Sequence, residues 1–306
     1  MAKHAVLAGG SGFLGQALAV ALVRRDYTVT ILTRTPRAAS GGIEYLEWDG
    51  ATAGEWARSL EGAAAVVNLT GRSVNCIHSP ENRREILASR LNSVRVLNEA
   101  ISRCAQPPLA LVQAGSLAIY GDAGDRVCDE QAPHARDFSA DVCEQWEAAF
   151  ASGRTPQTRR VLLRVGLALG RGGGALQPLA KLARCFLGGT VGHGRQYLSW
   201  LHVADLNEMF IQAMERPEIM GAYNATGPAP VTNAEFMREL RHAVGRPWSP
   251  PAPEWAVRFG AHWIMRTDAD LALTGRRCVP RRFLEQGFQF RHAELAAALH
   301  DLLSRS

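Results

Sequence analysis

Seven residues near the N-terminus have the types and spacing that bind a phosphate group. Residues 9–15 read Gly-Gly-Ser-Gly-Phe-Leu-Gly and follow the short apolar run 5–8. Glycines permit a tight turn here and let a pyrophosphate approach the backbone, and the last one lets the next helix pack near the strand. The N–H groups at the start of that helix favour negative charge. The loop therefore predicts a dinucleotide site, and the alternative is a tight turn without a ligand. The predicted contacts are Gly9, Ser11, Gly12, Phe13, Leu14 and Gly15.

The segment after the next β-branched run indicates which dinucleotide binds. Residues 32–37 read Leu-Thr-Arg-Thr-Pro-Arg and contain no acid. NAD sites usually place Asp or Glu here to hold the ribose 2′-hydroxyl, and such a carboxylate would repel a 2′-phosphate. A guanidinium group instead pairs with the phosphate in a fork. We therefore predict NADP rather than NAD, with Arg34 as first choice for the 2′-phosphate and Arg37 as second. The alternative is that both arginines are solvated loop residues.

Short apolar runs that alternate with helical segments must position this loop. The strand-like runs are 5–8, 28–32, 63–69, 109–114 and 160–169, and the helical segments are 13–25, 81–103 and 138–151. This alternation indicates βαβ crossovers and a parallel sheet covered on both faces. The predicted fold is α/β, a Rossmann-type doubly wound parallel sheet with a smaller C-terminal α/β substrate lobe. We expect the dinucleotide domain at 1–170 plus about 200–227, and the lobe at about 171–199 and 228–306.

The composition is that of a globular chain and excludes several classes of function. The 306 residues are 47% hydrophobic and 21% charged, which excludes disorder as the main state. The net charge of +5 is scattered without a run of five like charges, so no nucleic-acid partner is expected. No uncharged apolar stretch reaches about 18 residues and no signal peptide is evident, so we expect a cytoplasmic protein without membrane contact. The six cysteines lack metal-binding spacing, which predicts reduced thiols and no metal site.

Longer motifs occur over almost the whole chain. They are GGSGFLG (9–15), LTRTP (32–36), WDG (48–50), NLTG (68–71), REILASR (84–90), IYGD (119–122), WEAAF (146–150), LALGRGGGAL (167–176), GHGRQYLSWLHVADL (192–206), NATGPAPVTNAEFM (224–237) and VPRRFLEQGFQF (279–290). Together they resemble the extended short-chain dehydrogenase/reductase superfamily. More narrowly, they resemble its atypical branch of NAD(P)-dependent "epimerase family" proteins, which carry a C-terminal domain of unknown function.

This resemblance implies further cofactor contacts. Asp49, after the third strand, would lie near the adenine, although the alternative is a turn or helix N-cap residue. The end of the fourth strand would line the ribose and pyrophosphate. The contacts implied there are Leu69, Thr70 and Gly71. Arg90 occupies a position where many relatives have an Asn that approaches the cofactor, and its alternative is a surface ion pair. The resemblance also implies a small-molecule substrate of unknown identity and a homodimer through the helices 81–103 and 138–151.

The catalytic residues of the family are only partly present. Typical members use a Ser or Thr after the fifth strand and a Tyr-x-x-x-Lys pair on the next helix, where the Lys lowers the pKa of the Tyr acid/base. Ser116 retains the serine position. With Glu147 aligned to the glutamate that often follows the pair, the Tyr and Lys positions hold Ser139 and Cys143. Ordinary hydride transfer at a hydroxyl therefore lacks its proton carrier.

Three interpretations follow from this departure. The chain is an oxidoreductase that uses other groups, a non-catalytic NADP-binding regulator or sensor, or a sugar-nucleotide epimerase with an unusual acid/base. Cys143 would serve as acid or nucleophile if its pKa were lowered, and the alternative is an inert buried cysteine. Other candidates for proton transfer or substrate contact are Tyr120, Glu147, Arg164, His193, Arg195, Gln196 and Tyr197. His202 and Asp205 are expected to form a structural hydrogen bond.

Overall fold

A central parallel sheet organises residues 3–304, the part of the chain that the computed structural model describes. Its strands are β1 (Lys3–Ala8), β2 (Tyr27–Thr33), β3 (Ile43–Glu47), β4 (Ala65–Asn68), β5 (Ala110–Ser116), β7 (Arg159–Val165) and β11 (Gly221–Ala225). The spatial order is β11-β7-β5-β4-β1-β2-β3, and all neighbours run parallel. The strand order reverses direction at β1 and β4, so a crevice opens at the carboxyl ends there. The predicted Rossmann-type doubly wound sheet is confirmed.

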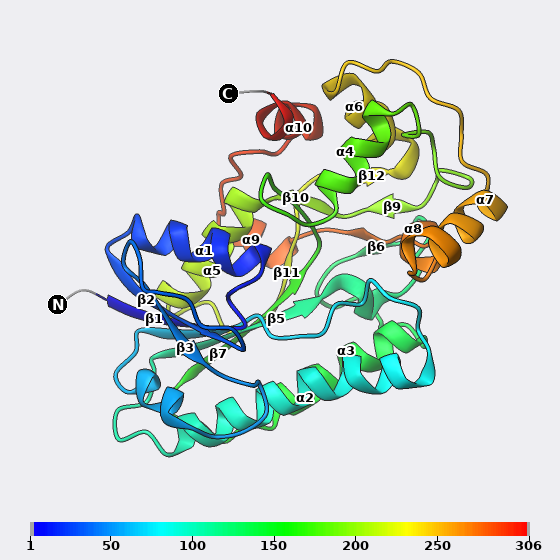
Figure 1. The fold of residues 1–306 in the computed structure, drawn as a ribbon. Coiled ribbons are helices and arrows are strands. Elements are labelled where there is room, and N and C mark those ends of the chain that lie inside the picture. The colour runs from blue at the N-terminus through cyan, green and yellow to red at the C-terminus, as the bar shows by residue number, and fades with distance from the viewer. Residues whose placement is uncertain (1–2, 305–306) are drawn as a thin grey trace.

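Helices cover both faces of the sheet, as Figure 1 shows. They are α1 (Phe13–Val23) and α5 (Val203–Glu215) on one face, and α2 (Pro80–Ser102) and α3 (Phe138–Ala151) on the other. Leu18 and Phe210 bury against the first face, and Val94 and Trp146 against the second. The helix α2 begins where the sequence provides an N-cap, because Ser79 accepts a hydrogen bond from Asn82 N and a proline follows it.

A second hydrophobic core lies beside the sheet, in the upper part of Figure 1. Its helices are α4 (Leu176–Arg184), α6 (Asn233–Ala243) and α10 (Leu295–Leu303). Two short strand pairs connect it to the sheet, β8 (Leu167–Leu169) with β10 (Trp200–His202), and β9 (Tyr197–Leu198) with β12 (Val231–Thr232). Trp200 and Phe236 are fully buried at its centre. The smaller lobe therefore has a core of its own.

The C-terminal segment returns from this lobe to the sheet. Its elements are α7 (Glu254–Phe259), η3 (Gly260–Met265), α8 (Asp270–Leu273), β13 (Arg277–Cys278) and α9 (Arg281–Glu285). The strand β13 pairs in parallel with β6 (Val127–Cys128). Phe283 and Phe288 pack into the core of the sheet, where Phe283 contacts the ring of Tyr223. Two short 3₁₀ helices, η1 (Glu55–Leu60) and η2 (Leu117–Tyr120), complete the described elements.

The predicted strand 160–169 is split in the structure. Its first part is β7 in the main sheet, whereas β8 pairs with β10 outside it. Gly166 lies at the break, and a Cβ there would come within 2.4 Å of Ser199 O. The chain therefore leaves the sheet where a second backbone crosses it closely, which a periodicity of apolar residues does not reveal. Within residues 3–304, every helix is too short or too polar to span a membrane.

Candidate functional site

Three glycines shape the turn between β1 and α1, each for a different physical reason. Gly9 has a φ of +71°, and a Cβ there would lie 2.7 Å from Thr70 Oγ1. At Gly15 a Cβ would come within 2.3 Å of Gly10, so the helix can approach the turn only with glycine. Gly12, by contrast, has nothing within 4 Å of its Cβ position. The turn therefore presents open space at Gly12 while its other glycines allow close packing.

A cavity of about 740 Å³ lies beside this turn, at the carboxyl ends of the first strands. The predicted residues that line it are Gly9, Ser11, Gly12, Arg34, Asp49, Leu69, Thr70 and Gly71. They come from the turns that follow β1, β2, β3 and β4. The ends of neighbouring parallel strands meet at one edge of the sheet, which is why the fold brings these separate motifs together. The roles assigned to them remain predictions.

The hydroxyl of Thr70 shows that this cavity fits a polar ligand. Thr70 Oγ1 is buried and has no hydrogen-bond partner, whereas Thr70 N donates to Asn68 Oδ1 at 3.1 Å. Buried polar atoms are almost always paired, so this hydroxyl requires a partner. Gly9 lies directly beside it without a side chain. A ribose or phosphate oxygen of a dinucleotide would satisfy the hydroxyl, and the residues present fit such a group.

Arg34 is the cation of this wall. Its side chain is exposed at the end of β2, and no ion pair holds it among the described residues. Arg37 is also exposed but does not line the cavity. Thr33, which directly precedes Arg34, donates from Oγ1 to Ser11 Oγ at 3.1 Å and so connects the end of β2 to the glycine turn. An uncommitted guanidinium at the rim can pair with a phosphate in a fork.

Asp49 forms a turn and also lines the cavity. Its carboxylate accepts hydrogen bonds from Ala51 N at 2.8 Å, Thr52 N at 2.9 Å and Thr52 Oγ1 at 2.7 Å. The bond from the Thr52 hydroxyl, followed by the backbone bonds, lowers the pKa of Asp49 below its usual range. The turn interpretation is therefore confirmed, and the contact with adenine stays a prediction.

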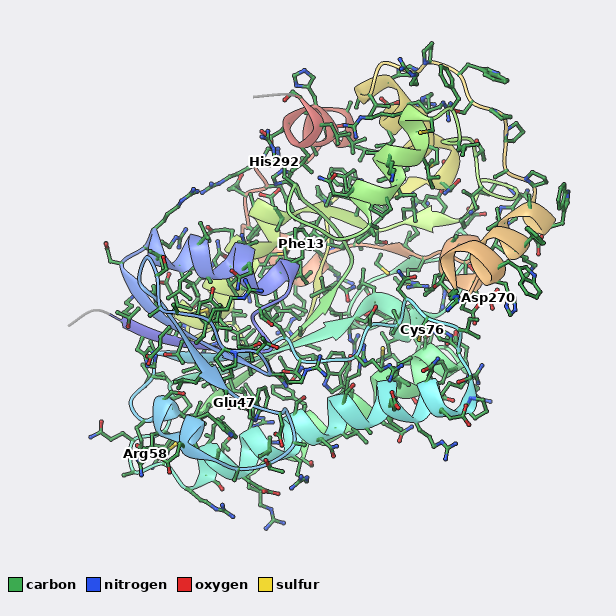
Figure 2. The ribbon with its side chains drawn as sticks, viewed as in Figure 1. Phe13, Glu47, Arg58, Cys76, Asp270 and His292 are labelled. Carbon is green, nitrogen blue, oxygen red and sulfur yellow. The ribbon has the colours of Figure 1, made fainter. Side chains whose placement is uncertain are left out.

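Four predicted cofactor residues do not line the cavity, namely Phe13, Leu14, Gly15 and Arg90. The ring of Phe13 packs against the backbone of the smaller lobe, because a Cβ at Gly170 or Gly173 would come within 2.5 Å or 2.9 Å of the Phe13 side chain. Figure 2 shows Phe13 at the start of α1, where it meets that lobe. The side chain of Leu14 packs against the core of the sheet. Only backbone N–H groups of these three helix residues remain available to a phosphate.

Arg90 fixes the loop that forms one wall of the cavity. Its Nη1 donates to Arg72 O at 3.1 Å and to Ile86 O at 2.9 Å, and its guanidinium lies 5.0 Å from the centre of the Trp146 ring. The surface ion pair proposed as its alternative is not formed among the described residues, because the guanidinium is tied to backbone carbonyls. A Cβ at Gly71 would lie 3.2 Å from Arg90 Cζ, so the side chain supports that turn from behind.

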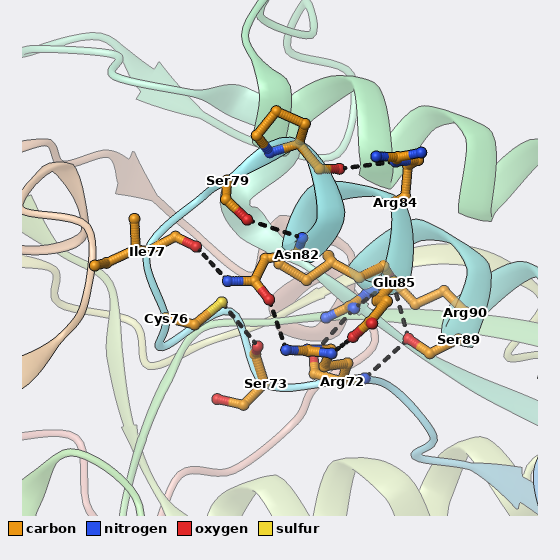
Figure 3. Close-up of polar contacts among 12 residues, drawn as sticks. Arg72, Ser73, Cys76, Ile77, Ser79, Asn82, Arg84, Glu85, Ser89 and Arg90 are labelled. Atoms are coloured by element: carbon orange, nitrogen blue, oxygen red, sulfur yellow. Dashed lines mark hydrogen bonds and ion pairs between the residues drawn. The ribbon is translucent and has the colours of Figure 1, made fainter.

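The same loop carries residues that sequence reasoning missed. Figure 3 shows it held against the start of α2, where Asn82 Nδ2 donates to Ile77 O at 2.7 Å and Ser89 Oγ accepts from Arg72 N at 3.0 Å. Arg72 forms an ion pair with Glu85, and both line the cavity. A signal was present, since Arg72 directly follows the motif at 68–71. Because Glu85 neutralises Arg72, this pair adds no net positive charge to the cavity wall.

A second cavity of about 230 Å³ opens at the ends of β5 and β7. Ser116 lines it, as the serine position of the family requires, and its Oγ accepts from Ala118 N at 3.1 Å. Its opposite walls come from residues 197–199 and 274–276, which lie far along the chain. The Tyr197 hydroxyl has no hydrogen-bond partner within residues 3–304, and the guanidinium of Arg277 lies 5.2 Å from the centre of its ring. Ser116 and Tyr197 are therefore brought together only by the fold.

Cys143 does not line either cavity. It is buried with Leu117, Tyr120 and Cys278. Burial raises the pKa of the Cys143 thiol to about 12, followed by the nearby charge of Glu147, while Arg90 and Arg276 act in the opposite direction. A thiol with a raised pKa is a poor nucleophile at neutral pH. The structure favours the buried-cysteine interpretation over a catalytic role.

Three of the other candidates for proton transfer or substrate contact, Arg164, Glu147 and Tyr120, are bonded to one another around a buried ion pair. Arg164 donates to Glu147 through Nε at 2.9 Å and Nη2 at 2.8 Å, and its Nη1 donates to Tyr120 Oη at 2.7 Å. Tyr120 Oη in turn donates to Asn224 Oδ1 at 2.9 Å, and burial raises its pKa to about 12. Arg164, one of the candidates for substrate contact, has its guanidinium bonded to Glu147 and Tyr120. Its guanidinium instead joins α3 to the sheet.

The histidines of the smaller lobe are structural or remote. His202 caps α5 by accepting Ala204 N on Nδ1, so the neutral ring carries its proton on Nε2, which faces Asp301 at 3.3 Å. That tautomer leaves no free lone pair for a metal, although His292 stacks on the ring at 3.8 Å. Asp205 accepts from the backbone at 291–292, so the expected His202–Asp205 bond is not formed. His193 is exposed and lines neither cavity.

The geometry agrees with comparisons to known proteins. Residues 5–225 match the NAD dependent epimerase/dehydratase family, and residues 252–302 match a domain of unknown function (DUF1731). Epimerase family protein SDR39U1 of Bos taurus is 36% identical over 98% of this chain and 99% of its own length. Epimerase family protein MT2273 of Mycobacterium tuberculosis is 35% identical over 96% of this chain and 95% of its own.

Solved structures give the same relationship. The human epimerase family protein SDR39U1, crystallised with NADPH, has a TM-score of 0.87 and 34% identity, covering 98% of this chain and 99% of its own. MoeE5 in complex with UDP-glucose and NAD has a TM-score of 0.76 at 19% identity over 98% and 97% of the two chains, so it shares the fold. The chain therefore belongs to the NAD dependent epimerase/dehydratase family of extended short-chain dehydrogenases/reductases, with a DUF1731 domain at its C-terminal end.

Proposed function

We propose that this protein binds NADPH in the 740 Å³ cavity and uses it to reduce a small carbonyl compound in the cavity at Ser116. The observation that carries the proposal is the buried, unpartnered hydroxyl of Thr70, which lies against Gly9 at the wall of that cavity, between the glycine turn and the end of β4. The human relative crystallised with NADPH supports the choice of dinucleotide.

Each part of the cofactor has a matching group in the cavity wall. The turn at residues 9–12 and the N–H groups at the start of α1 hold the pyrophosphate, because a helix N-terminus favours negative charge. Arg34 pairs with the 2′-phosphate, and Asp49 lies at the adenine end. Thr70 and Gly71 line the ribose next to the pyrophosphate. The nicotinamide end of the cofactor would then be left to the residues at the carboxyl end of β5.

The second cavity supplies the groups that act on the substrate. Bound NADPH supplies a hydride to a carbonyl carbon. Ser116 holds the carbonyl oxygen by donating its hydroxyl proton in a hydrogen bond. Tyr197 lines the same cavity, and its hydroxyl has no hydrogen-bond partner within residues 3–304. Its phenol gives a proton to the carbonyl oxygen, which becomes the hydroxyl of the alcohol product. Solvent then returns a proton to the phenolate.

A second candidate function is a non-catalytic NADPH-binding regulator. It is favoured by a specific observation, which is that the usual acid/base positions hold Ser139 and Cys143. Burial raises the pKa of Cys143 to about 12, and Tyr120 is committed to Arg164 and Asn224. In this function the second cavity would bind an effector rather than a reactant.

One experiment separates the two functions. NADPH affinity is measured by calorimetry, and NADPH oxidation is then followed at fixed cofactor saturation with a library of small aldehydes, ketones and 2-oxo acids. We expect measurable turnover that Tyr197→Phe lowers by ~10²-fold or more, because general acid help is typically worth ~10²–10⁴-fold. Ser139→Ala is the matched control and should leave the rate unchanged. NADPH binding without turnover on any carbonyl would favour the regulator.

A further inference from the structure

Three of the polar side chains that line the cavity at Ser116 carry hydrogen-bond donors that have no acceptor among the described residues. They belong to Ser116, Tyr197 and Arg276. Arg276 Nε donates to Gly121 O at 2.9 Å, and its two Nη groups have no acceptor among the described residues. All three side chains carry hydrogen-bond donors, and none of the residues that line the cavity is Asp or Glu.

Backbone contacts hold Arg276 in this place before any ligand arrives. Arg276 N donates to Tyr197 O at 3.0 Å, and Gly275 N donates to Asp122 Oδ1 at 3.1 Å. A Cβ at Gly275 would come within 2.5 Å of Tyr197 N, so glycine is required for the two segments to touch. The side chain is half-buried. A fixed, partly desolvated guanidinium binds an oxyanion more strongly than a solvated one.

The size of the cavity limits the ligand. Its volume of about 230 Å³ is less than a third of the 740 Å³ beside the glycine turn, and ligand pockets usually measure about 300–1,000 Å³. A nucleotide sugar, with its base, ribose, two phosphates and hexose, would have to extend well beyond this space, whereas a small molecule would be contained in it. Apolar side chains of Leu167, Leu198 and Leu271 form part of the wall and suit a short carbon chain.

We propose that the cavity at Ser116 binds a small organic oxyanion, with Arg276 pairing with the anionic group and Ser116 and Tyr197 facing the reacting end. Arg276 is then a residue that determines substrate specificity, and it is supplied by the C-terminal segment that matches DUF1731. The inference rests on the proposed function only in treating this cavity as the substrate site. It separates this protein from structural relatives that act on nucleotide sugars.

The test uses the full chain saturated with NADP⁺, so that no reduction occurs. Butyrate and propylphosphonate are titrated as carboxylate and phosphonate probes, with butyramide as the neutral probe of nearly the same shape as butyrate. We expect at least one anion to bind about tenfold or more tightly than butyramide, because a charge-assisted bond to a guanidinium is lost with the charge. The stronger of the two anions identifies the head group. UDP-glucose should neither bind nor displace the anion.

Two variants assign the effect to Arg276. Arg276→Gln should weaken anion binding about tenfold or more and leave the NADPH dissociation constant and thermal unfolding unchanged. Arg184→Gln removes the same charge from an exposed side chain that lines neither cavity and should change anion binding little. The proposal is overturned if neither anion binds, if butyramide binds equally well, if Arg276→Gln binds the anion as the wild type does, or if UDP-glucose occupies the cavity. The anion titration is repeated without NADP⁺, so that failure of NADPH binding would reject the proposed function while the anion titration still tests this inference.

Discussion

The 740 Å³ cavity at the glycine turn and the 230 Å³ cavity at Ser116 lie along the same edge of the sheet, but the chain builds them differently. The first is formed by turns that directly follow β1, β2, β3 and β4, and backbone geometry determines much of it. The second joins the ends of β5 and β7 to side chains at residues 197–199 and 274–276. The large cavity therefore depends on features common to the fold, whereas the small cavity depends on side chains that lie far along the chain from β5 and β7.

The ionisable groups of the two regions also differ in their exposure and in their partners. Arg34 is exposed and uncommitted at the rim of the large cavity. Next to the small cavity, Arg164, Glu147 and Tyr120 are locked together in the interior. This frame holds α3 in place, and the chemistry that we propose falls to Ser116, Tyr197 and Arg276, which line the small cavity. Four predictions test this contrast.

The largest effect is expected at Gly12. The change Gly12→Val places three carbon atoms in open space at the cavity wall, since nothing lies within 4 Å of the Cβ position and the backbone there is extended, with φ −80°. NADPH binding should be lost below detection by calorimetry while thermal unfolding is retained. Gly260→Val is the control, because its Cβ position is also open and lies outside the cavity. Unchanged NADPH affinity in Gly12→Val would mean that the pyrophosphate binds elsewhere.

The next largest effect concerns stability beside the small cavity. Glu147→Gln removes the carboxylate from Arg164, whose side chain is 6% exposed, and leaves a buried charge without its partner. Breaking such a pair costs about 3–5 kcal/mol, which urea unfolding would measure. Glu254→Gln breaks the exposed pair with Arg258, and the expected cost there is below about 1 kcal/mol. Equal losses in the two variants would contradict the idea of a rigid internal frame.

A third prediction addresses cofactor choice. Arg34→Gln should weaken NADPH binding about ten- to hundredfold, because a charge-assisted bond to the 2′-phosphate is worth roughly 1.5–3 kcal/mol. NADH, which lacks that phosphate, should bind nearly as before. Arg37→Gln serves as the control, since Arg37 does not line the cavity. A similar loss for both cofactors would show that Arg34 does not read the 2′-phosphate.

The smallest effect is expected from Cys143 at alkaline pH. Burial raises its pKa to about 12 in the folded protein, from about 9 for a free thiol. Between these values the unfolded chain binds fewer protons, so the free energy of unfolding falls as pH rises, by at most about 1.4 kcal/mol per pH unit. Cys143→Ala should make this fall shallower in urea unfolding at pH 9 to 11. At pH 8, iodoacetamide should label the exposed Cys185 and leave Cys143 unmodified in the folded protein. Rapid labelling of Cys143 at pH 8 would support the hypothesis that this thiol is an acid or nucleophile.

Local patterns predicted most of the sheet and the cofactor side. The glycine turn, the basic end of β2 and the motif at 68–71 each follow a strand directly, so their position at one edge of the sheet follows from the alternation of strands and helices. Arg72 was missed although it adjoins the motif at 68–71. The second hydrophobic core, built from α4, α6 and α10, could not be placed because its parts are separated by long stretches of chain.

By itself, the sequence determined the doubly wound sheet, the glycine turn and the absence of a Tyr-x-x-x-Lys pair from the expected helix, because these depend on residues close together in the chain. Only the tertiary structure decided which side chains are available for chemistry. It buried Cys143, paired Arg164 with Glu147 at 2.8 Å, and brought Arg276 and Tyr197 to the cavity at Ser116. Burial and pairing join residues at very different separations along the chain, from 17 positions for Glu147 and Arg164 to 160 positions for Ser116 and Arg276. Local propensity does not predict such contacts. The contacts in turn determine the protonation and reactivity of the side chains that make them.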